Sequence, residues 1–470
     1  MVFPVVGGDG KPTGYEIDNS LRLNNGDNPN LTFTPSSAVT SERRTFTISW
    51  WVKRGADFGT TGFMWEMGGN DNANERIIAR FDGNNRLNVN DSSTAFRIPN
   101  RLFRDPSAWY HLVVAFDTTD GTADNRVKVY VNGVQETSFL TSNNPGQNDT
   151  KGFSHNSEHT IARTNIDNGF SFDGYMTEFH AVGGSQLDAT SFGEFNDNGV
   201  WIPKKYTGSH GTNGFFLEFQ QTGTSQNSSG IGAATSGNDN HFAVANLAAL
   251  DVTTDTCTNN FCTLNPLDSK SGDTYSEGNT AISTVDSGDS PSRSTFSLTG
   301  GKWYWEVKRT SAGSPDLAIG VMEQSEAFNN LIGSTAKGYG YYSANGNKYN
   351  NDSNSSYGNS FGDGDIIGIA LDMDNGVIWF SKNGTWQNSA TQSEIENGTT
   401  TNSAFTGISG TISPAISDGG SGSSTAEFNF GNAPFSISSG NSDANGYGNF
   451  EYAVPSGYYS LNTKNLAEFG

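Results

Sequence analysis

The sequence predicts an all-β protein composed of two antiparallel β-sandwiches joined by an irregular linker. Short segments of apolar or alternating character recur along the chain and are separated by Gly, Asn and Ser, as expected for strands and turns. Aromatic residues make up 12% of the chain, which is too many for a disordered protein although only 33% of the residues are apolar. A length of 470 residues leaves room for about two to three domains with real cores.

Three strands are predicted with particular clarity in the first half. Residues 45–54, "TFTISWWVKR", alternate apolar and polar side chains with the period of two of a half-buried strand. Residues 110–117, "YHLVVAFD", form a more continuous apolar run that suits a central strand. Residues 127–131 alternate again and lead to Asn132-Gly133, a pair that tolerates the positive φ angles of a type I′ turn. The sequence therefore predicts a tight hairpin there.

The second half repeats this order of strand types. In residues 366–386, an apolar strand is followed by an alternating strand and then by an Asn-Gly turn. In "GGKWYWEVKR", alternation places Trp303 and Trp305 on one face and Tyr304 on the other. We expect both tryptophans in a core and Tyr304 on the surface. The repeated order predicts two sandwiches of related architecture.

Composition suggests where the sandwiches begin and end. We expect an N-terminal lead (1–14), a first sandwich (15–219), a linker (220–265) and a second sandwich with a C-terminal extension (266–470). The linker opens with a Gly-, Ser- and Asn-rich tract at 220–240, which indicates a flexible or draped segment. Short helical turns are expected at 187–195 and within 241–250.

The net charge of −22 argues against binding to nucleic acid or to an anionic membrane, because both need clusters of Lys and Arg. No apolar run approaches the roughly 18 to 20 residues of a membrane-spanning helix. The N-terminus lacks the basic region and long apolar segment of a secretory signal. Cys257 and Cys262 fit neither a redox motif nor a zinc set, and whether they form a disulfide stays open.

The segments of the first half resemble a laminin-G-like (concanavalin A-like) domain over roughly residues 15 to 200. The resemblance is carried by "NSLRLN", "FTISWWVKR", "WYHLVVAFD", "VKVYVNGVQ" and "FDGYMTEFHAV" followed by "LDATSF". The second half resembles a SPRY (B30.2-like) domain over about residues 270 to 440, through "GKWYWEV", "AIGVM", "GYGYYSANGNKY", "GDIIGIALDMDNGVIWFSKNG", "ISPAIS" and "FNFGNAPF". Both resemblances imply a concanavalin A-like sandwich of jelly-roll type.

The domain pair, with "GVWIPKKYTGSHGTNGFFLEF", "NNFCTLNPLD" and "GYYSLNTKNL", resembles virion structural proteins of marine bacteriophages. This resemblance implies a non-enzymatic protein that is made in the host cytoplasm and exposed on the extracellular particle. A tail-fibre or receptor-binding component and a head-attached decoration or head-fibre protein are the two expected roles. The implied partners are other virion proteins and a host surface glycan or protein, and we expect a homo-oligomer. A secreted glycan-binding adhesin is a further alternative.

A concanavalin-like glycoside hydrolase is the enzymatic alternative. Such an enzyme needs two carboxylates flanking a cleft, and one arrangement on this fold is Glu-x-Asp-x-Glu on a single strand. The nearest match supplies Glu16 and Asp18, but Ser20 replaces the third acid. His155 and His159 are four residues apart in what is expected to be a surface loop entering a strand, which does not suit a zinc pair. We therefore expect no enzyme activity.

Two acidic loops, 117–125 and 372–376, are candidates for calcium binding, because calcium takes oxygen ligands. Neither loop has EF-hand spacing, and both lie where hairpin turns are expected, so turn chemistry alone explains the acids. No cofactor is expected.

The polar loop 343–360, "SANGNKYNNDSNSSYGNS", is the main candidate for binding. Asn and Ser supply hydrogen-bonding groups, and exposed Tyr side chains can stack on a glycan or pack on a protein epitope. A solvated hairpin loop is the alternative interpretation. The candidate ligand-binding residues are Asn345, Tyr349, Asn350 and Tyr357.

Overall fold

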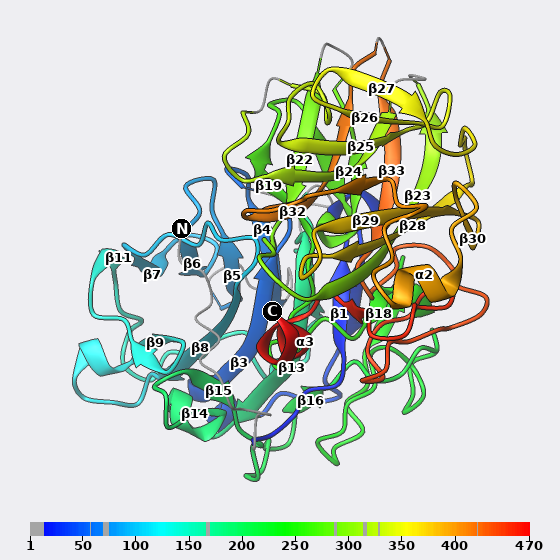
Figure 1. Ribbon diagram of the computed structural model, residues 1–470. Coiled ribbons are helices and arrows are strands. Elements are labelled where there is room, and N and C mark those ends of the chain that lie inside the picture. Colours follow the sequence, from blue (N-terminus) through cyan, green and yellow to red (C-terminus); the bar gives the residue numbers. More distant parts are fainter. Residues whose placement is uncertain are drawn as a thin grey trace. The chain divides into compact units, whose positions relative to one another are not determined.

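The computed structural model describes residues 14–56, 58–68, 75–165, 170–285, 289–313, 317–327, 330–420 and 422–470. The chain divides into two compact units, one ending at Thr258 and the other spanning Asn259–Gly470. Each unit is built on two antiparallel sheets, which confirms the predicted all-β class (Figure 1). The only parallel strand pair among the described residues joins β23 and β34, whose bounds are given below.

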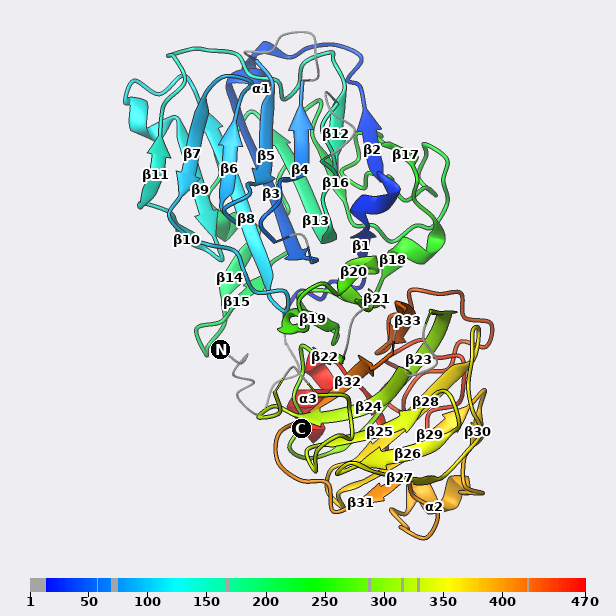
Figure 2. The same cartoon turned by 90° about the horizontal axis from the view of Figure 1, so that it is seen from above.

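The first unit contains two eight-stranded sheets and a small two-stranded one (Figure 2). One sheet has the order β10 (Val134–Gln135), β9 (Val127–Val131), β8 (Trp109–Asp117), β3 (Thr45–Arg54), β13 (Gly174–Gly183), β1 (Ser20–Leu23) and β18 (Val252–Thr253), with β16 (Phe215–Leu217) paired to β13. The other has the order β11 (Phe139–Ser142), β7 (Ala95–Pro99), β6 (Leu87–Asn90), β5 (Ile77–Phe81), β4 (Gly62–Met67), β12 (His159–Ile161), β2 (Asn30–Phe33) and β17 (Ala243–Ala245). The small sheet pairs β14 (Gly193–Phe195) with β15 (Trp201–Pro203).

The second unit contains a seven-stranded and a nine-stranded sheet. The former has the order β19 (Leu264–Ser269), β22 (Ser290–Ser294), β32 (Ile412–Asp418), β24 (Leu317–Glu323), β25 (Gly338–Tyr342), β26 (Asn347–Asn350) and β27 (Ser353–Ser356). The latter has the order β20 (Thr274–Ser276), β21 (Ala281–Ser283), β33 (Ser424–Asn429), β23 (Lys302–Ala312), β28 (Ile366–Asp372), β29 (Val377–Lys382) and β30 (Thr385–Trp386), with β31 (Phe405–Thr406) paired to β29 and β34 (Tyr459–Ser460) to β23.

The predicted Asn-Gly hairpins are both present. Asn132 and Gly133 have φ angles of 47° and 82° and join β9 to β10. Asn383 and Gly384 have φ angles of 49° and 77° and join β29 to β30. Positive φ at both central residues is the mark of a type I′ turn, whose twist matches that of the flanking strands.

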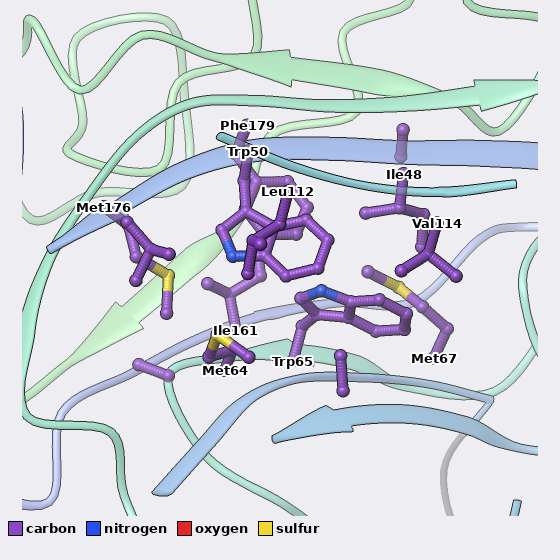
Figure 3. Packing of buried hydrophobic residues seen from close by; sticks show 14 of the residues in the cluster. Ile48, Trp50, Met64, Trp65, Met67, Leu112, Val114, Ile161, Met176 and Phe179 are labelled. Atoms are coloured by element: carbon purple, nitrogen blue, oxygen red, sulfur yellow. The ribbon is translucent and has the colours of Figure 1, made fainter. Parts of the chain in front are cut away.

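The main core of each unit is aromatic, as alternation predicts. In the first unit, Trp50 from β3 meets Trp65 from β4 edge to face, with 5.6 Å between ring centroids (Figure 3). In the second, Trp303 and Trp305 of β23 are fully buried. The prediction that these two tryptophans form a fold core and no stacking platform for a ligand is confirmed.

The prediction that Tyr304 is exposed is wrong. Its exposed fraction is only 1%, because the C-terminal extension covers the outer face of β23 and places Phe450 edge to face against its ring. The Tyr304 hydroxyl donates a hydrogen bond to the buried carboxylate of Glu306. The sheet is therefore covered on both faces at this point, and alternation alone shows only that one face is apolar.

Residues 220–258, which fall within the predicted linker, are part of the first unit. Strand β17 pairs with β2, and β18 pairs with β1. Asp255 lies 2.8 Å from the ammonium of Lys53 on β3, and both side chains are only 1% exposed. A Gly- and Ser-rich composition thus accompanies a segment held by strand pairing and a buried ion pair.

The described helices are short: α1 (Thr40–Arg44), α2 (Gln392–Glu396) and α3 (Thr463–Phe469). None of those in the described ranges has the length and apolar character of a membrane-spanning helix. The helical turn expected at 187–195 is reduced to a 3₁₀ turn at Ala189–Ser191 followed by β14. The helical turn expected within 241–250 is reduced to a 3₁₀ turn at Ala249–Asp251, since pairing with the edge of β2 makes the first half of the segment the strand β17.

Candidate binding site

The predicted loop 343–360 folds mainly as a β-hairpin. Strands β26 and β27 pair without a register shift and are joined by Asn351 and Asp352. Both joining residues have positive φ, 53° and 56°, so they form another two-residue turn of the type that Asn and Asp tolerate. The hairpin is the outer end of the seven-stranded sheet.

A pocket of about 170 Å³ opens on one face of this hairpin. Its lining side chains are uncharged. The lining residues are Leu331, Tyr342, Asn345, Asn347, Tyr349 and Asn354. Amide groups beside aromatic rings can bind a ligand by hydrogen bonding and stacking. The lining contains no carboxylate, imidazole or thiol, so it lacks the usual groups for acid–base or nucleophilic chemistry.

Two of the predicted residues, Asn345 and Tyr349, line this pocket. Asn345 is exposed, and its side-chain oxygen accepts a hydrogen bond from the Asn347 backbone N–H at 2.9 Å. Tyr349 meets Tyr342 edge to face at 6.1 Å and donates its hydroxyl proton to Asp352 at 2.7 Å. This hydrogen bond to a carboxylate, with partial burial, raises the pKa of Tyr349.

The other two predicted residues do not line the pocket. The Asn350 side chain donates to the Gly338 carbonyl at 2.7 Å and so fastens β26 to β25. The predicted exposure of Tyr357 is wrong: it is 5% exposed and packs edge to face on Tyr341 in the core. Its hydroxyl accepts a hydrogen bond from the Phe380 backbone N–H, and burial raises its pKa.

Sequence reasoning missed four lining residues. Asn347 and Asn354 lie on the same side of the hairpin as Tyr349, and alternation from Tyr349 would have found them once the turn at 351–352 was recognised. Tyr342 comes from the neighbouring strand β25, and Leu331 comes from a loop. No local pattern identifies Leu331, because its place depends on a tertiary contact.

Close approach of the Leu331 loop to the hairpin requires glycine at position 333. Gly333 has a φ of +98°, a conformation that L side chains rarely adopt. A Cβ atom there would lie 2.5 Å from the Tyr349 ring. Gly333 therefore allows the loop to pack closely against Tyr349.

Comparison with protein families identifies both halves. Residues 302–433 match the SPRY domain, and residues 25–185 match the concanavalin A-like lectin/glucanases superfamily. The chain contains a concanavalin A-like domain and a SPRY domain. The predicted domain combination is thereby confirmed, and the pocket belongs to the SPRY domain. Domains of these two kinds are β-sandwich binding modules.

The individual relatives match only segments of the chain. It is 34% identical over 86 residues to the Ran-binding proteins 9/10 homolog of Drosophila melanogaster, which covers 18% of this chain and 9% of that protein. It is 33% identical over 93 residues to the Set1 complex component ash2 of Schizosaccharomyces pombe, covering 19% and 14%. The chain thus spans a small part of either relative. The SPRY domain of human HERC1 is 20% identical, with a TM-score of 0.28, and the match covers 35% of this chain and 96% of that one.

The acidic loops proposed for calcium form turns. In the concanavalin A-like domain, Asp117 accepts hydrogen bonds from the backbone N–H and hydroxyl of Thr119. In the SPRY domain, buried Asp372 accepts from Asn375 and lies 3.2 Å from the Lys302 ammonium. Within the described ranges, no three His, Cys, Asp or Glu side chains gather as metal ligands would. These contacts account for the acids without a bound cation.

The residues weighed for catalysis belong to the first unit, whereas the pocket hairpin belongs to the second. Glu16 is half-buried and Asp18 exposed, and both precede β1, which begins at Ser20. His155 is partly exposed, whereas His159 begins β12 and is fully buried, so the expected surface position is wrong for His159. Cys257 and Cys262 are not joined by a disulfide.

A buried histidine cluster in the first unit was not anticipated. His180 Nδ1 lies 3.2 Å from His210 Nε2, and the Trp201 indole N–H donates to His111 Nδ1 at 3.0 Å. Burial lowers the pKa of His180 to about 3 and raises that of Glu178 to about 8. Their contact at 3.5 Å is therefore between neutral groups at pH 7. The cluster packs with aromatic rings and acts as core.

Proposed function

We propose that this chain is a non-enzymatic binding protein of a bacteriophage virion, located on the extracellular particle. The domain pair supports this proposal, because both halves are binding modules, and the joining segments resemble those of marine phage virion proteins. The observation that carries the binding role is the SPRY-domain pocket, where Tyr342 and Tyr349 stand among Asn side chains and no acid–base pair. Such a lining suits recognition and not bond cleavage.

The proposal includes two roles within the particle. In a tail fibre or receptor-binding protein, the pocket faces the host, and the chain forms a homo-oligomer that adsorbs to cells. In a head decoration or head fibre, the pocket or a sheet edge holds a neighbouring virion protein. We favour the tail role, because the pocket combines stacking and hydrogen-bonding groups that suit a surface glycan or protein.

Immunogold labelling of intact phage particles tests the proposal. Antibodies raised against the full chain should label particles, with tail label supporting the host-attachment role and head label supporting decoration. Absence of label on particles that contain the chain's gene would overturn the virion role. The enzymatic alternative has its own test: hydrolysis of host-surface glycans by the purified protein, lost in Glu16→Gln but kept in Asp18→Asn, would overturn the non-enzymatic assignment.

A further inference from the structure

Strand β27 is an unprotected sheet edge. It is the last strand of the seven-stranded sheet, four residues long, and its pairing with β26 is regular throughout (Figures 1 and 2). Every other strand that ends a sheet in the described ranges is shorter or irregularly paired. Those of two or three residues are β10, β14, β15, β17, β18, β20 and β30, and those paired through a register shift are β11 and β19.

The sequence of β27, Ser-Asn-Ser-Ser, carries none of the usual devices that prevent strand addition. Native edges are commonly guarded by Pro, Lys, inward charges or bulges. All four side chains of β27 are small or neutral, and all four are exposed. Its edge is therefore free of steric and charge barriers to another strand.

Two residues of β27 direct their backbone groups away from the sheet. The two-residue turn at 351–352 makes Asn350 and Ser353 a hydrogen-bonded pair, and such pairs alternate along an antiparallel hairpin. The N–H and C=O groups of Asn354 and Ser356 consequently point outward. Among the described residues, no further strand or loop backbone bonds to them.

The pocket lies on one face of the hairpin and reaches its outer strand, β27. Asn354 of β27 and Asn347 and Tyr349 of β26 line it together. A strand added to β27 would carry alternate side chains over this same face, because side chains alternate along a strand. One of them would lie beside Asn354 at the rim of the pocket, and a large side chain there would lean over β27 towards Tyr349.

The charge around the pocket is negative. Asp352 accepts the Tyr349 hydroxyl, and Asp289 contributes to raising the pKa of that hydroxyl. A Cβ atom at Gly419 would lie 3.1 Å from Leu331 and 3.3 Å from Asp289, so Asp289 stands beside the pocket wall. With a net charge of −22, a second copy would be repelled from this edge, whereas a cationic partner would be attracted.

We propose that β27 binds an extended segment of another protein, which adds as a further strand and places one apolar or aromatic side chain in the adjacent pocket, beside a Lys or Arg. This mode rests on the proposed binding role of the pocket and specifies its partner as a cationic, strand-forming peptide. Main-chain hydrogen bonds to Asn354 and Ser356 provide affinity, and the pocket provides specificity.

The probe is a displayed library of random peptides of about twelve residues, selected on the full chain. Enriched peptides should share one large apolar residue near a Lys or Arg. Their binding, measured by fluorescence anisotropy, should weaken about tenfold or more in Asn354→Pro, which removes one outward N–H and blocks strand addition. Asn354→Thr, which removes the same pocket side chain but keeps the N–H, should bind these peptides at least about threefold more tightly than Asn354→Pro. Bound peptide should also slow hydrogen exchange at Asn354 and Ser356.

Pro at an outward-facing edge position spares the pairing with β26, so both variants should keep the parent Tm. Equal peptide binding by Asn354→Pro and the parent would refute strand addition, as would a library that yields no enriched peptide. A dimer that Asn354→Pro dissociates, or a glycan that binds through Tyr349 irrespective of Asn354→Pro, would refute the proposed partner. Peptide binding without immunogold label would leave this proposal standing and remove only the virion role.

Discussion

The two sandwiches cover the outer face of one of their sheets in chemically different ways. In the first unit, Trp51 and the imidazoles of His111 and His180 lie under segments that include Trp201, and a buried Lys53–Asp255 pair holds the chain nearby. In the second, Tyr304 and Trp379 lie under the C-terminal extension. The buried Glu306 carboxylate accepts two hydrogen bonds from backbone N–H groups of that extension and two from side chains of the sheet.

The two units differ completely in their histidine content. All six histidines lie before Thr258, and none lies in Asn259–Gly470. The first unit therefore contains groups whose ordinary pKa is near neutrality, whereas the second does not. Both units thus bury the outer face of a sheet to a similar extent. Their stabilities should differ in how they respond to side-chain truncation, to removal of a buried charge and to pH, and each difference can be measured.

The largest expected effect is shared by the two units. Trp50→Ala and Trp305→Ala each remove a fully buried indole, which should cost roughly 3 to 5 kcal/mol of unfolding free energy. Calorimetry of the full chain should show each variant lowering the transition of its own unit. Full solubility and an unchanged Tm in Trp305→Ala would contradict its place in the core.

Removal of a buried negative charge should destabilise the first unit more than the second. Asp255→Asn leaves the 1%-exposed Lys53 ammonium without its carboxylate, and we expect a loss of about 3 kcal/mol. Glu306→Gln keeps one oxygen, which can accept from the Tyr452 backbone N–H, but turns an amide donor towards the Glu451 N–H, and we expect a loss of about 1 to 2 kcal/mol. Chemical denaturation of both variants measures the difference. Equal losses of unfolding free energy in the two variants would contradict this difference between the units.

The strands and both cores could be predicted because they depend on local alternation. The run that contains Trp50 fixes which side chains face the core, and Asn132-Gly133 fixes the hairpin. Tyr304 was misassigned because residues far along the chain, such as Phe450, cover it. The binding site was located only in part for the same reason, since Leu331 reaches the pocket through a tertiary contact.

Acidification should destabilise the first unit selectively. Burial lowers the pKa of His111 and His180 to about 3 and of His159 and His210 to about 4, from 6.5. The unfolded chain takes up protons below pH 6.5 while these imidazoles stay neutral in the fold, so their contribution is complete above pH 6.5 and is lost as pH falls towards 4. Burial also raises the pKa of Glu178 to about 8 and raises the pKa values of Glu66 and Asp251. These three carboxyls act in the opposite direction and reduce the net loss, but the four imidazoles outnumber them.

Between pH 7 and pH 5, the Tm of the first unit should therefore fall by several degrees, while that of the second unit changes less. Burial raises the pKa of Glu306 in the second unit, so its contribution is present below its unfolded pKa and is lost as pH rises through the folded value. Calorimetric scans at both pH values, with transitions assigned by the two tryptophan variants, measure this. A larger fall in the second unit would contradict the histidine argument.

The smallest expected effect concerns the hairpin of the second unit. Asn350→Ala removes the hydrogen bond to the Gly338 carbonyl and should cost about 1 kcal/mol. Because Asn350 holds β26 against β25, the loss should appear as faster local hydrogen exchange in residues 347–356 with little change in the Tm of the unit. The matched control is Asn345→Ala, whose side chain is exposed and bonds only within its own turn. Equal exchange in the two variants would show that the hairpin is held by its strand pairing alone.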